Sequence, residues 1–176
     1  MTVLHTRRLL LREFTLEDDA FVLGLLNEPG FLRYIGDKGV RTLSDAREYL
    51  QKGPLDSYRR NGFGLYAACI SPGGSATPLG MCGLVKREGL SDPDIGFAFL
   101  ERHWGHGYAA ESAAAILEHG TRELKLPRIV AITSPDNFGS IRVLEKIGLK
   151  FDRLMRLTED SKQVKLFGPA AAREFI

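Results

Sequence analysis

A chain of 176 residues has the length of one domain, and 44% hydrophobic residues are enough to build a buried core. The formal net charge of +2 excludes the strong basic excess of a nucleic-acid-binding domain. No apolar run approaches the roughly 18 residues that span a bilayer, and the N-terminal residues lack a signal-peptide pattern. We therefore expect one cytoplasmic domain over residues 1–176, with neither nucleic acid nor membrane as a partner.

The N-terminal third of the chain predicts one strand followed by helices. The run RLLLREF at residues 8–14 is short, apolar and charged at both ends, as is typical of a strand. Thr15 precedes Asp18 by three residues, and Thr42 precedes Asp45 by three; both pairs fit the capping box that begins a helix. The expected elements are a strand at 8–14, a helix at 15–26, a long loop or broken helix at 27–41, and a helix at 42–60 interrupted near Gly53 and Pro54.

From residue 62 onward, short apolar segments alternate with turn sequences. The turns hold clusters of glycine, proline and serine, such as SPGGSATP at residues 71–78. Short connections of this kind favour antiparallel neighbours. The expected strands are 63–70, 79–86 and 94–100, and the expected turns are 71–78 and 89–93.

A helical period replaces the strand pattern near residue 109. Its apolar face would consist of Ala110, Ala113, Ala114, Leu117 and Leu124. The remaining expected elements are the end of that helix at 125 before Pro127, a strand at 128–134, a helix at 137–147 stopped by Gly148, and strands at 149–157 and 163–167. Because a strand–helix–strand unit requires a parallel pair, we expect an α/β fold with one mixed sheet and helices on its faces.

The two cysteines, Cys69 and Cys82, each lie in an apolar segment and are expected to be buried thiols. The sequence holds no CxxC pair and no His/Cys cluster with metal-ligand spacing, so we expect no metal site and no cysteine nucleophile.

The segment DIGFAFLERHWGHGYAA at residues 94–110 carries the clearest functional pattern: a strand, a loop with two glycines, and a helix. The first N–H groups of a helix have no partner within it and suit a phosphate, and Gly105 and Gly107 allow the backbone to approach the ligand closely. A lone G-x-G is also compatible with an ordinary turn. Gly105, Gly107 and Ala110 further fit the dinucleotide fingerprint, but four residues separate the strand from Gly105 and only one strand–helix–strand unit follows.

The string WGHGYA at residues 104–109 resembles the acetyl-CoA signature of the GNAT superfamily of N-acetyltransferases. TRRLLLREF at 6–14 resembles the opening strand of the Rim-type (RimJ/RimL) ribosomal-protein N-terminal acetyltransferases, and NFGSIRVLEKIGL at 137–149 resembles their second-helix block. The three blocks stand in the family's order and spacing.

This resemblance implies the GNAT fold: mostly antiparallel strands, a central parallel pair splayed by a β-bulge, and helices on both faces. It implies acetyl-CoA as co-substrate and direct acetyl transfer to a primary amine, first of all the N-terminal α-amine of a protein or peptide. A small-molecule amine acceptor, such as an antibiotic or a polyamine, and a non-catalytic CoA-binding module are the alternatives. An exposed sheet edge would also allow a homodimer.

The resemblance also implies the cofactor-binding residues. The pyrophosphate would be held by backbone amides within residues 104–109, and pantetheine would pair with the main chain of Phe97 and Phe99. The cofactor set implied is Phe97, Phe99, Trp104, Gly105, His106, Gly107, Tyr108, Ala109, Asn137 and Ser140. For Phe97 and Phe99 core packing is the simpler reading of the side chains, and for Asn137 it is a helix N-cap.

Three residues are expected to take part in catalysis, namely Ser140, Asp94 and Asn137. The serine of Rim-type members that matches Ser140 is proposed to protonate the departing thiolate; Leu144 stands where many GNAT enzymes have a tyrosine acid. Asp94 is the first candidate for the general base, before Glu101 and His103, although a strand-end surface acid is the plainer reading. An α-amine with a pKa near ~8 is about 10% neutral at pH 7 and needs little help from a base.

Acceptor specificity is expected to lie in the variable segments 27–41 and 158–162. Neither segment holds the acidic cluster that would bind a polyamine.

Overall fold

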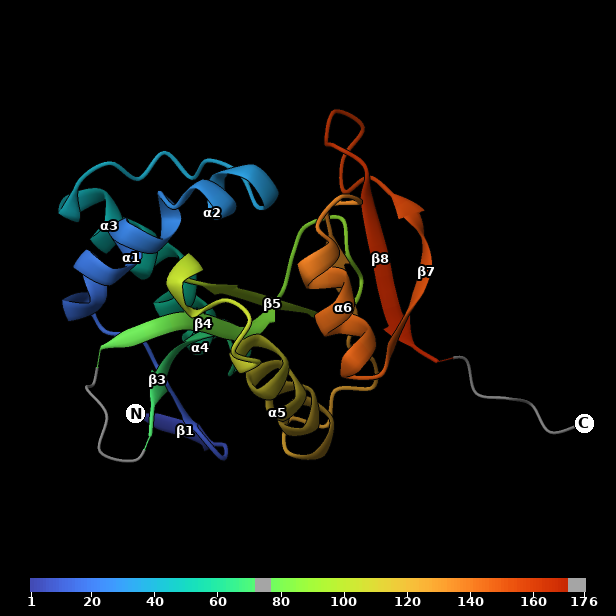
Figure 1. The fold of residues 1–176 in the computed structure, drawn as a ribbon, viewed down its shortest axis with the longest axis horizontal. Coiled ribbons are helices and arrows are strands. Elements are labelled where there is room, and N and C mark those ends of the chain that lie inside the picture. Colours follow the sequence, from blue (N-terminus) through green and yellow to red (C-terminus); the bar gives the residue numbers. More distant parts are fainter. Residues whose placement is uncertain (72–76, 171–176) are drawn as a thin grey trace, which may run out of the picture.

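The computed structural model describes residues 1–71 and 77–170, and it contains two β-sheets that touch at one point (Figure 1). Of the turn expected at 71–78, residues 72–76 lie outside the described part. The larger sheet is antiparallel throughout, with each strand beside the next. Its strands are β1 (Thr2–His5), β2 (Leu9–Arg12), β3 (Leu65–Ile70), β4 (Pro78–Val85) and β5 (Asp94–Phe99).

The smaller sheet has the order β6-β8-β7 and is also antiparallel; its strands are β6 (Ala131–Thr133), β7 (Leu149–Met155) and β8 (Val164–Pro169). The two sheets meet at a single parallel bridge between Asp94 and Val130. There the Ile95 N–H donates to the Val130 carbonyl at 2.8 Å, and the Val130 N–H donates to the Pro93 carbonyl at 3.0 Å. The single mixed sheet that we expected is therefore divided in two, and the expected parallel pair forms the junction.

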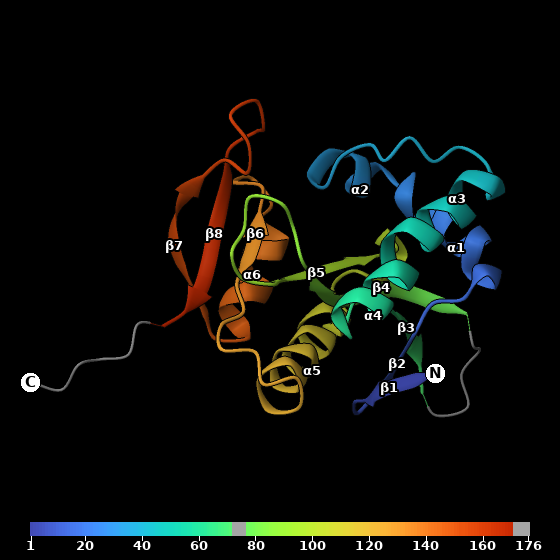
Figure 2. The same ribbon diagram turned by 180° about the vertical axis from the view of Figure 1, so that it is seen from behind.

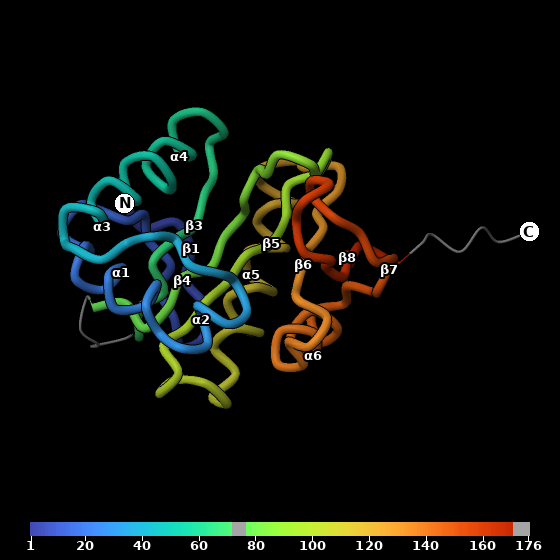
Figure 3. Tube along the Cα trace, turned by 90° about the horizontal axis from the view of Figure 1, so that it is seen from above, coloured from blue at the N-terminus to red at the C-terminus, as the bar shows by residue number. Residues whose placement is uncertain are grey.

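The splay at this junction does not arise from a β-bulge in the pairing of β5 with β4. That register is continuous from Phe99 opposite Gly80 to Asp94 opposite Val85. Beyond the Asp94–Val130 bridge, β6 is only three residues long and pairs with β8 but not with β5. Among the described residues, β5 therefore keeps one edge unpaired beyond the bridge, and Figure 3 shows the two halves of the molecule on either side of it.

Helices cover both faces of the larger sheet, as predicted. Figure 1 shows α5 in front of this sheet, whereas Figure 2, seen from behind, shows α3 and α4 in front. The buried side chains form two clusters: one joins α5 to the sheet through residues such as Ile116 and Ile95, and the other joins α1 and α3 to it through Leu25 and Met81. The helices are α1 (Asp19–Leu26), α2 (Pro29–Tyr34), α3 (Leu43–Leu50), α4 (Asp56–Asn61), α5 (Tyr108–Arg122) and α6 (Phe138–Lys146).

One strand, β1, was not predicted, because no pattern in the sequence indicated it. The segment expected as a long loop or a broken helix at 27–41 contains the short helix α2, and the interruption expected near Gly53 and Pro54 is present. The interruption of the 42–60 helix is a π-helical segment, Gln51–Leu55, which holds Pro54; a proline removes a helix N–H and prevents regular α-helical bonding.

The buried stripe of α5 also differs from the predicted face. Ala113 and Ile116 are fully buried and Gly120 is buried one turn later, whereas Ala114 is exposed. A β-carbon on Gly120 would lie 2.5 Å from the Ile129 Cδ1, so this glycine permits close packing. No helix in residues 1–71 and 77–170 is long and apolar enough to cross a bilayer.

Candidate functional site

The loop before α5 presents a row of unpaired backbone N–H groups. Gly105 and Gly107 have φ angles of +77° and +81°, a conformation that glycine adopts without strain, and Gly107 caps α5 with no side-chain hydrogen bond. Within the described part of the chain, the N–H groups of residues 105–110 have no hydrogen-bond acceptor. Such a run at the positive end of a 15-residue helix is suited to a pyrophosphate.

Arg8 braces this loop, a role that no pattern in the sequence indicated. Its Nη1 donates to the His106 carbonyl at 2.9 Å, its Nε donates to the Glu111 carboxylate at 2.7 Å, and its guanidinium carbon lies 4.7 Å from the centroid of the Tyr108 ring. Glu111 also accepts from the Thr6 hydroxyl at 2.6 Å. Although burial opposes it, these donors lower the pKa of Glu111, so the carboxylate stays charged and holds Arg8 beside the loop.

The aromatic and imidazole rings of the loop make contacts within the protein. The His106 Nδ1 lies 2.9 Å from the Trp104 carbonyl oxygen, and the His106 ring stacks on Tyr108 at 5.7 Å between centroids. The Trp104 Nε1 donates to the Phe99 carbonyl at 2.8 Å. The main chain rather than these side chains is therefore what the loop offers to a ligand.

Trp104 and Glu101 also tie the loop to α2. The Gly30 N–H donates to Glu101 Oε1 at 2.6 Å, and the Glu101 N–H donates to Glu28 Oε2 at 2.6 Å. A β-carbon on Gly30 would lie 2.4 Å from the Trp104 ring, so only glycine fits there. Because the Glu101 carboxylate is engaged with α2, it is poorly placed as a general base, and His103 has its Nε2 engaged by the Arg102 Nε at 3.2 Å.

The open edge of β5 offers main-chain groups to a second part of a ligand. Strand residues alternate in direction, and the Ile95 N–H points to β6, so the main-chain groups of Phe97 and Phe99 point to the same side. There β6 has diverged, and of these groups only the Phe99 carbonyl has a partner in the described residues. The Phe99 ring is 6% exposed and lies over Gly80, so its side chain belongs to the core, while the Phe97 side chain lines a cavity.

Helix α6 begins across the open edge from the loop. The Asn137 Oδ1 accepts from the Ser140 N–H at 3.1 Å, so the N-cap role exists, and its side-chain amide donors remain available. The Ser140 hydroxyl has no hydrogen-bond partner in the described part of the chain and is half-buried. Leu144 is 1% exposed, within the core cluster, and offers no acid.

Asp94 is buried at the junction of the sheets, so the reading as a surface acid is wrong. It is 1% exposed; its Oδ1 accepts from the Arg87 Nε at 2.8 Å, and its Oδ2 has no partner in the described residues. Burial, opposed in part by Arg87, raises the pKa of Asp94 to about 6. A carboxyl group with this pKa changes its charge close to neutral pH, which suits a general base.

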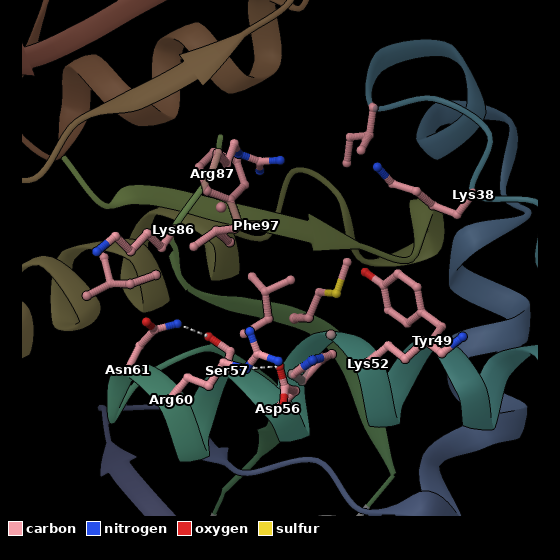
Figure 4. A pocket seen from close by; sticks show the side chains of 18 of the residues that line it. Lys38, Tyr49, Lys52, Asp56, Ser57, Arg60, Asn61, Lys86, Arg87 and Phe97 are labelled. Carbon is pink, nitrogen blue, oxygen red and sulfur yellow. Dashed lines mark hydrogen bonds and ion pairs between the residues drawn. The ribbon is translucent and has the colours of Figure 1, made fainter. Parts of the chain in front are cut away.

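A cavity of about 450 Å³ opens on the face of the sheet that carries α3 and α4 (Figure 4). Its walls come from α2, α3, the π-helical segment, α4, β3, β4 and β5. It reaches Gly96 and Phe97 of β5, and Arg87 of its lining is bonded to Asp94. Phe31, Ile35 and Lys38 contribute from the variable segment 27–41, whereas no residue of 158–162 does.

Neither cysteine lies in this arrangement. Cys69 and Cys82 are buried thiols, as expected. Burial raises the pKa of both, that of Cys82 to about 12, so neither is a thiolate at neutral pH.

Over most of its length the chain is similar to an acetyltransferase family model and to proteins of Bacillus subtilis (strain 168). The model of the acetyltransferase (GNAT) domain matches residues 8–150. Two Bacillus subtilis (strain 168) proteins are each 34% identical to this chain. The uncharacterized protein YkkB matches over 158 residues, which cover 88% of this chain and 89% of YkkB. The uncharacterized N-acetyltransferase YnaD matches over 146 residues, which cover 82% of this chain and 81% of YnaD.

Solved structures show the same fold. An acetyltransferase from Agrobacterium tumefaciens str. C58 superposes with a TM-score of 0.80 at 24% identity, covering 96% of this chain and 94% of its own. RimL, a ribosomal L7/L12 alpha-N-protein acetyltransferase, superposes with a TM-score of 0.75 at 16% identity, covering 96% of this chain and 93% of its own. AAC(6')-Ib, solved with parmomycin and acetyl-CoA, superposes with a TM-score of 0.70 at 20% identity, covering 92% of each chain. The predicted fold class is thereby confirmed, and the chain belongs to the GNAT family of N-acetyltransferases.

Proposed function

We propose that this acetyltransferase moves the acetyl group of acetyl-CoA directly to the N-terminal α-amine of a protein or peptide. One observation carries the proposal: the open edge of β5 and the cavity both include Phe97, and the same strand leads into the loop whose amides at residues 105–110 have no acceptor in the described residues. A cofactor on one side of β5 and an acceptor on the other would therefore meet at this strand.

The residues fit acetyl-CoA in two places. The N–H groups of Gly105, His106, Gly107, Tyr108 and Ala109 would hold the pyrophosphate, with the Trp104 segment shaping the loop and Arg8 close by. The main chain of Phe97 and Phe99 would pair with the pantetheine amides as a strand would. The Phe99 N–H, which is free, would donate to the acetyl carbonyl oxygen as negative charge develops on it.

The chain's own groups would then move two protons. In transfer, the amine nitrogen forms a bond to the acetyl carbon while the carbon–sulfur bond breaks, and the CoA sulfur leaves as a thiolate. Asp94, through its free Oδ2 and a water reaching it from the cavity, would accept the proton lost by the amine. Ser140, whose hydroxyl has no partner in the described residues, would pass a proton to the thiolate and regain one from solvent, and the Asn137 side chain would contact the cofactor next to it.

The α-amine is favoured over other amines because the site holds one carboxylate with a modestly raised pKa rather than a strong base. An α-amine with a pKa near ~8 costs roughly 1.4 kcal/mol to deprotonate at pH 7, whereas a lysine amine near ~10.4 costs roughly 4.6 kcal/mol. Among proteins with a similar fold, RimL is described as acting on a ribosomal protein, and AAC(6')-Ib was solved with a small molecule. A small-molecule amine is therefore the second candidate.

Release of CoA thiol tests this proposal. We expect thiol release with acetyl-CoA and N-terminal peptides, and mass spectrometry should place the acetyl group on the α-amine rather than on a lysine side chain. Acetylation of small amines alone would favour the second candidate. Acetyl-CoA binding without turnover on any acceptor would contradict transferase activity and leave a CoA-binding module.

A further inference from the structure

The cavity beside β5 is strongly cationic. Five basic side chains line it (Lys38, Lys52, Arg60, Lys86 and Arg87) against a single carboxylate, Asp56. A chain with a formal net charge of only +2 has no general reason to gather such an excess in one cavity. The excess is therefore a property of this cavity and not of the whole surface.

The lone carboxylate does not neutralise the cavity. Asp56 is engaged by Arg59 at 3.2 Å and by Arg60 at 2.7 Å, both along α4. Lys52, in the π-helical segment, pairs with Glu48 of α3 one turn earlier. In the described part of the chain, Lys38 and Lys86 have no acidic partner, so their charge remains uncompensated.

Three hydrogen-bond donors in the cavity lining come from different parts of the chain and converge. Figure 4 shows Lys38 and Arg87 pointing toward one another across the cavity and the Tyr49 hydroxyl pointing into the space between them. Desolvation and the positive charge of Arg87 lower the pKa of Lys38, which agrees with two cations held close together. The Tyr49 hydroxyl has no partner in the described residues. Arg87 uses its Nε on Asp94 Oδ1 at 2.8 Å, and its two Nη groups have no partner in the described residues, so they and Lys38 can still donate to a ligand.

Arg87 has Asp94 as a counter-ion, whereas Lys38 has no acidic partner in the described residues. Holding Lys38 opposite Arg87 therefore costs free energy that an anion between the two would lower. A carboxylate or phosphate of the acceptor would remove that repulsion and accept from Lys38, Tyr49 and Arg87. The same cavity reaches Gly96 and Phe97, where the amine must arrive. The anionic group and the amine would thus be two ends of one acceptor.

We propose that the acceptor is an amine that carries an anionic group, a carboxylate or phosphate, and that Lys38, Tyr49 and Arg87 bind this group. The proposal rests on the proposed function, because it assumes that the cavity receives the acceptor. Two kinds of acceptor carry an amine and an anionic group together: a peptide with acidic residues next to its N-terminus, and a free acidic amino acid. A polyamine or another polycation would meet like charge in this cavity.

Calorimetric binding to the CoA-loaded protein separates these acceptors without requiring turnover. One arm compares a hexapeptide beginning Ser-Asp-Glu with the same peptide beginning Ser-Asn-Gln, and a second arm compares aspartate with its diamide. We expect the acidic member of at least one pair to bind about tenfold or more tightly than its amide, and the arm that responds identifies the source. Spermidine serves as the polycation.

Variants of Lys38 link the preference to the cavity. Lys38→Gln should weaken binding of the acidic ligand about tenfold, which corresponds to about 1.4 kcal/mol, and Lys38→Arg should restore most of it. Lys150→Gln, at an exposed position of β7 outside the cavity lining, is the matched control and should change nothing. Circular dichroism and unchanged CoA affinity would show that each variant is folded.

Equal affinity for the acidic and amide members of both pairs, including no binding of either, would overturn the inference, as would tighter binding of spermidine. A preference that Lys38→Gln leaves intact would overturn it as well. Thiol release, measured in parallel, judges the proposed function separately: acidic ligands that bind selectively but are never acetylated would contradict the transferase and leave the anion site standing.

Discussion

Replacing Asp94 by asparagine tests the electrostatics at the junction of the two sheets. Burial raises the pKa of Asp94 from its ordinary value of 3.8 to about 6. Because the folded protein holds this proton more tightly than the unfolded chain, the stabilisation that results is present below pH 3.8 and is lost as the pH rises through 6. A difference of about 2 pKa units corresponds to about 3 kcal/mol.

The asparagine side chain does not titrate, so the comparison of interest is how the variant-minus-wild-type difference in unfolding free energy changes with pH. We expect Asp94→Asn to be more favourable at pH 7.5 than at pH 4 by most of that ~3 kcal/mol, or roughly 6–12 °C in Tm for a chain of this size. The asparagine oxygen can still accept from Arg87, and any constant cost of the new amide cancels in the pH comparison. Chemical denaturation at a series of pH values measures this difference.

Asp18→Asn provides a control of opposite sign. Asp18 is also buried, but hydrogen bonds from Arg12 and Thr15 outweigh desolvation and lower its pKa. Its loss should therefore destabilise the protein more at pH 7.5 than at low pH. A pH-independent difference for Asp94→Asn, or one with the sign of Asp18→Asn, would refute the reasoning about Asp94. In turnover, Asp94→Asn should shift the rate–pH profile to higher pH, and an unchanged profile would remove Asp94 as the base.

Three further predictions concern the cofactor loop and α6. Gly107→Ala places a β-carbon at a φ of +81°, so it should cost about 1 kcal/mol of stability and weaken acetyl-CoA binding at least about tenfold. Gly24→Ala in α1, with open space around it, is the control and should leave binding unchanged in titration calorimetry. Gly30→Ala should displace the Trp104 ring and lower stability by about 1–3 kcal/mol in thermal unfolding; wild-type stability would mean that the contact between α2 and the loop is not tight. Ser140→Ala should lower kcat about two- to tenfold with acetyl-CoA affinity nearly intact, and a collapse of binding instead would make Ser140 a cofactor contact.

Local patterns in the sequence predicted most of the elements because each is determined by neighbouring residues. The capping box at Thr42, confirmed by its bond from the Asp45 N–H at 3.1 Å, marked the start of α3. By contrast, β1 is a four-residue edge strand without a fully buried side, and so short a segment has no readable alternation. The division into two sheets was also beyond the sequence, because periodicity reveals strands but not where two strands stop pairing.

In the candidate site, too, the features made by neighbouring residues could be predicted, whereas those made by residues far apart in the sequence could not. The glycine loop and the helix after it are contiguous, so Gly105 and Gly107 could be predicted to adopt their observed backbone. The brace from Arg8 to Glu111 joins residues 103 apart, and the Gly30 contact with Glu101 joins residues 71 apart. Only the tertiary structure brings these pairs together.

The burial of Asp94 and the cationic cavity were likewise beyond reach. Asp94 stood at the start of a predicted strand, where an exposed acid was the plainer expectation, and its partner Arg87 lies across the turn between β4 and β5. Lys38, Tyr49 and Arg87 come from three separate parts of the chain. Only Lys38 lies in a segment, 27–41, that was expected to carry acceptor specificity. A homodimer and a cytoplasmic location stay predictions.

Binding of acetyl-CoA at the glycine loop is the central claim, and thermal unfolding with and without acetyl-CoA tests it most directly. At about 100 times its Kd a ligand adds about 2.7 kcal/mol, which amounts to a rise of roughly 5–11 °C in Tm for a domain of this size. We predict this rise with acetyl-CoA and none with NADH. No shift with acetyl-CoA, or a shift with NADH instead, would contradict the account.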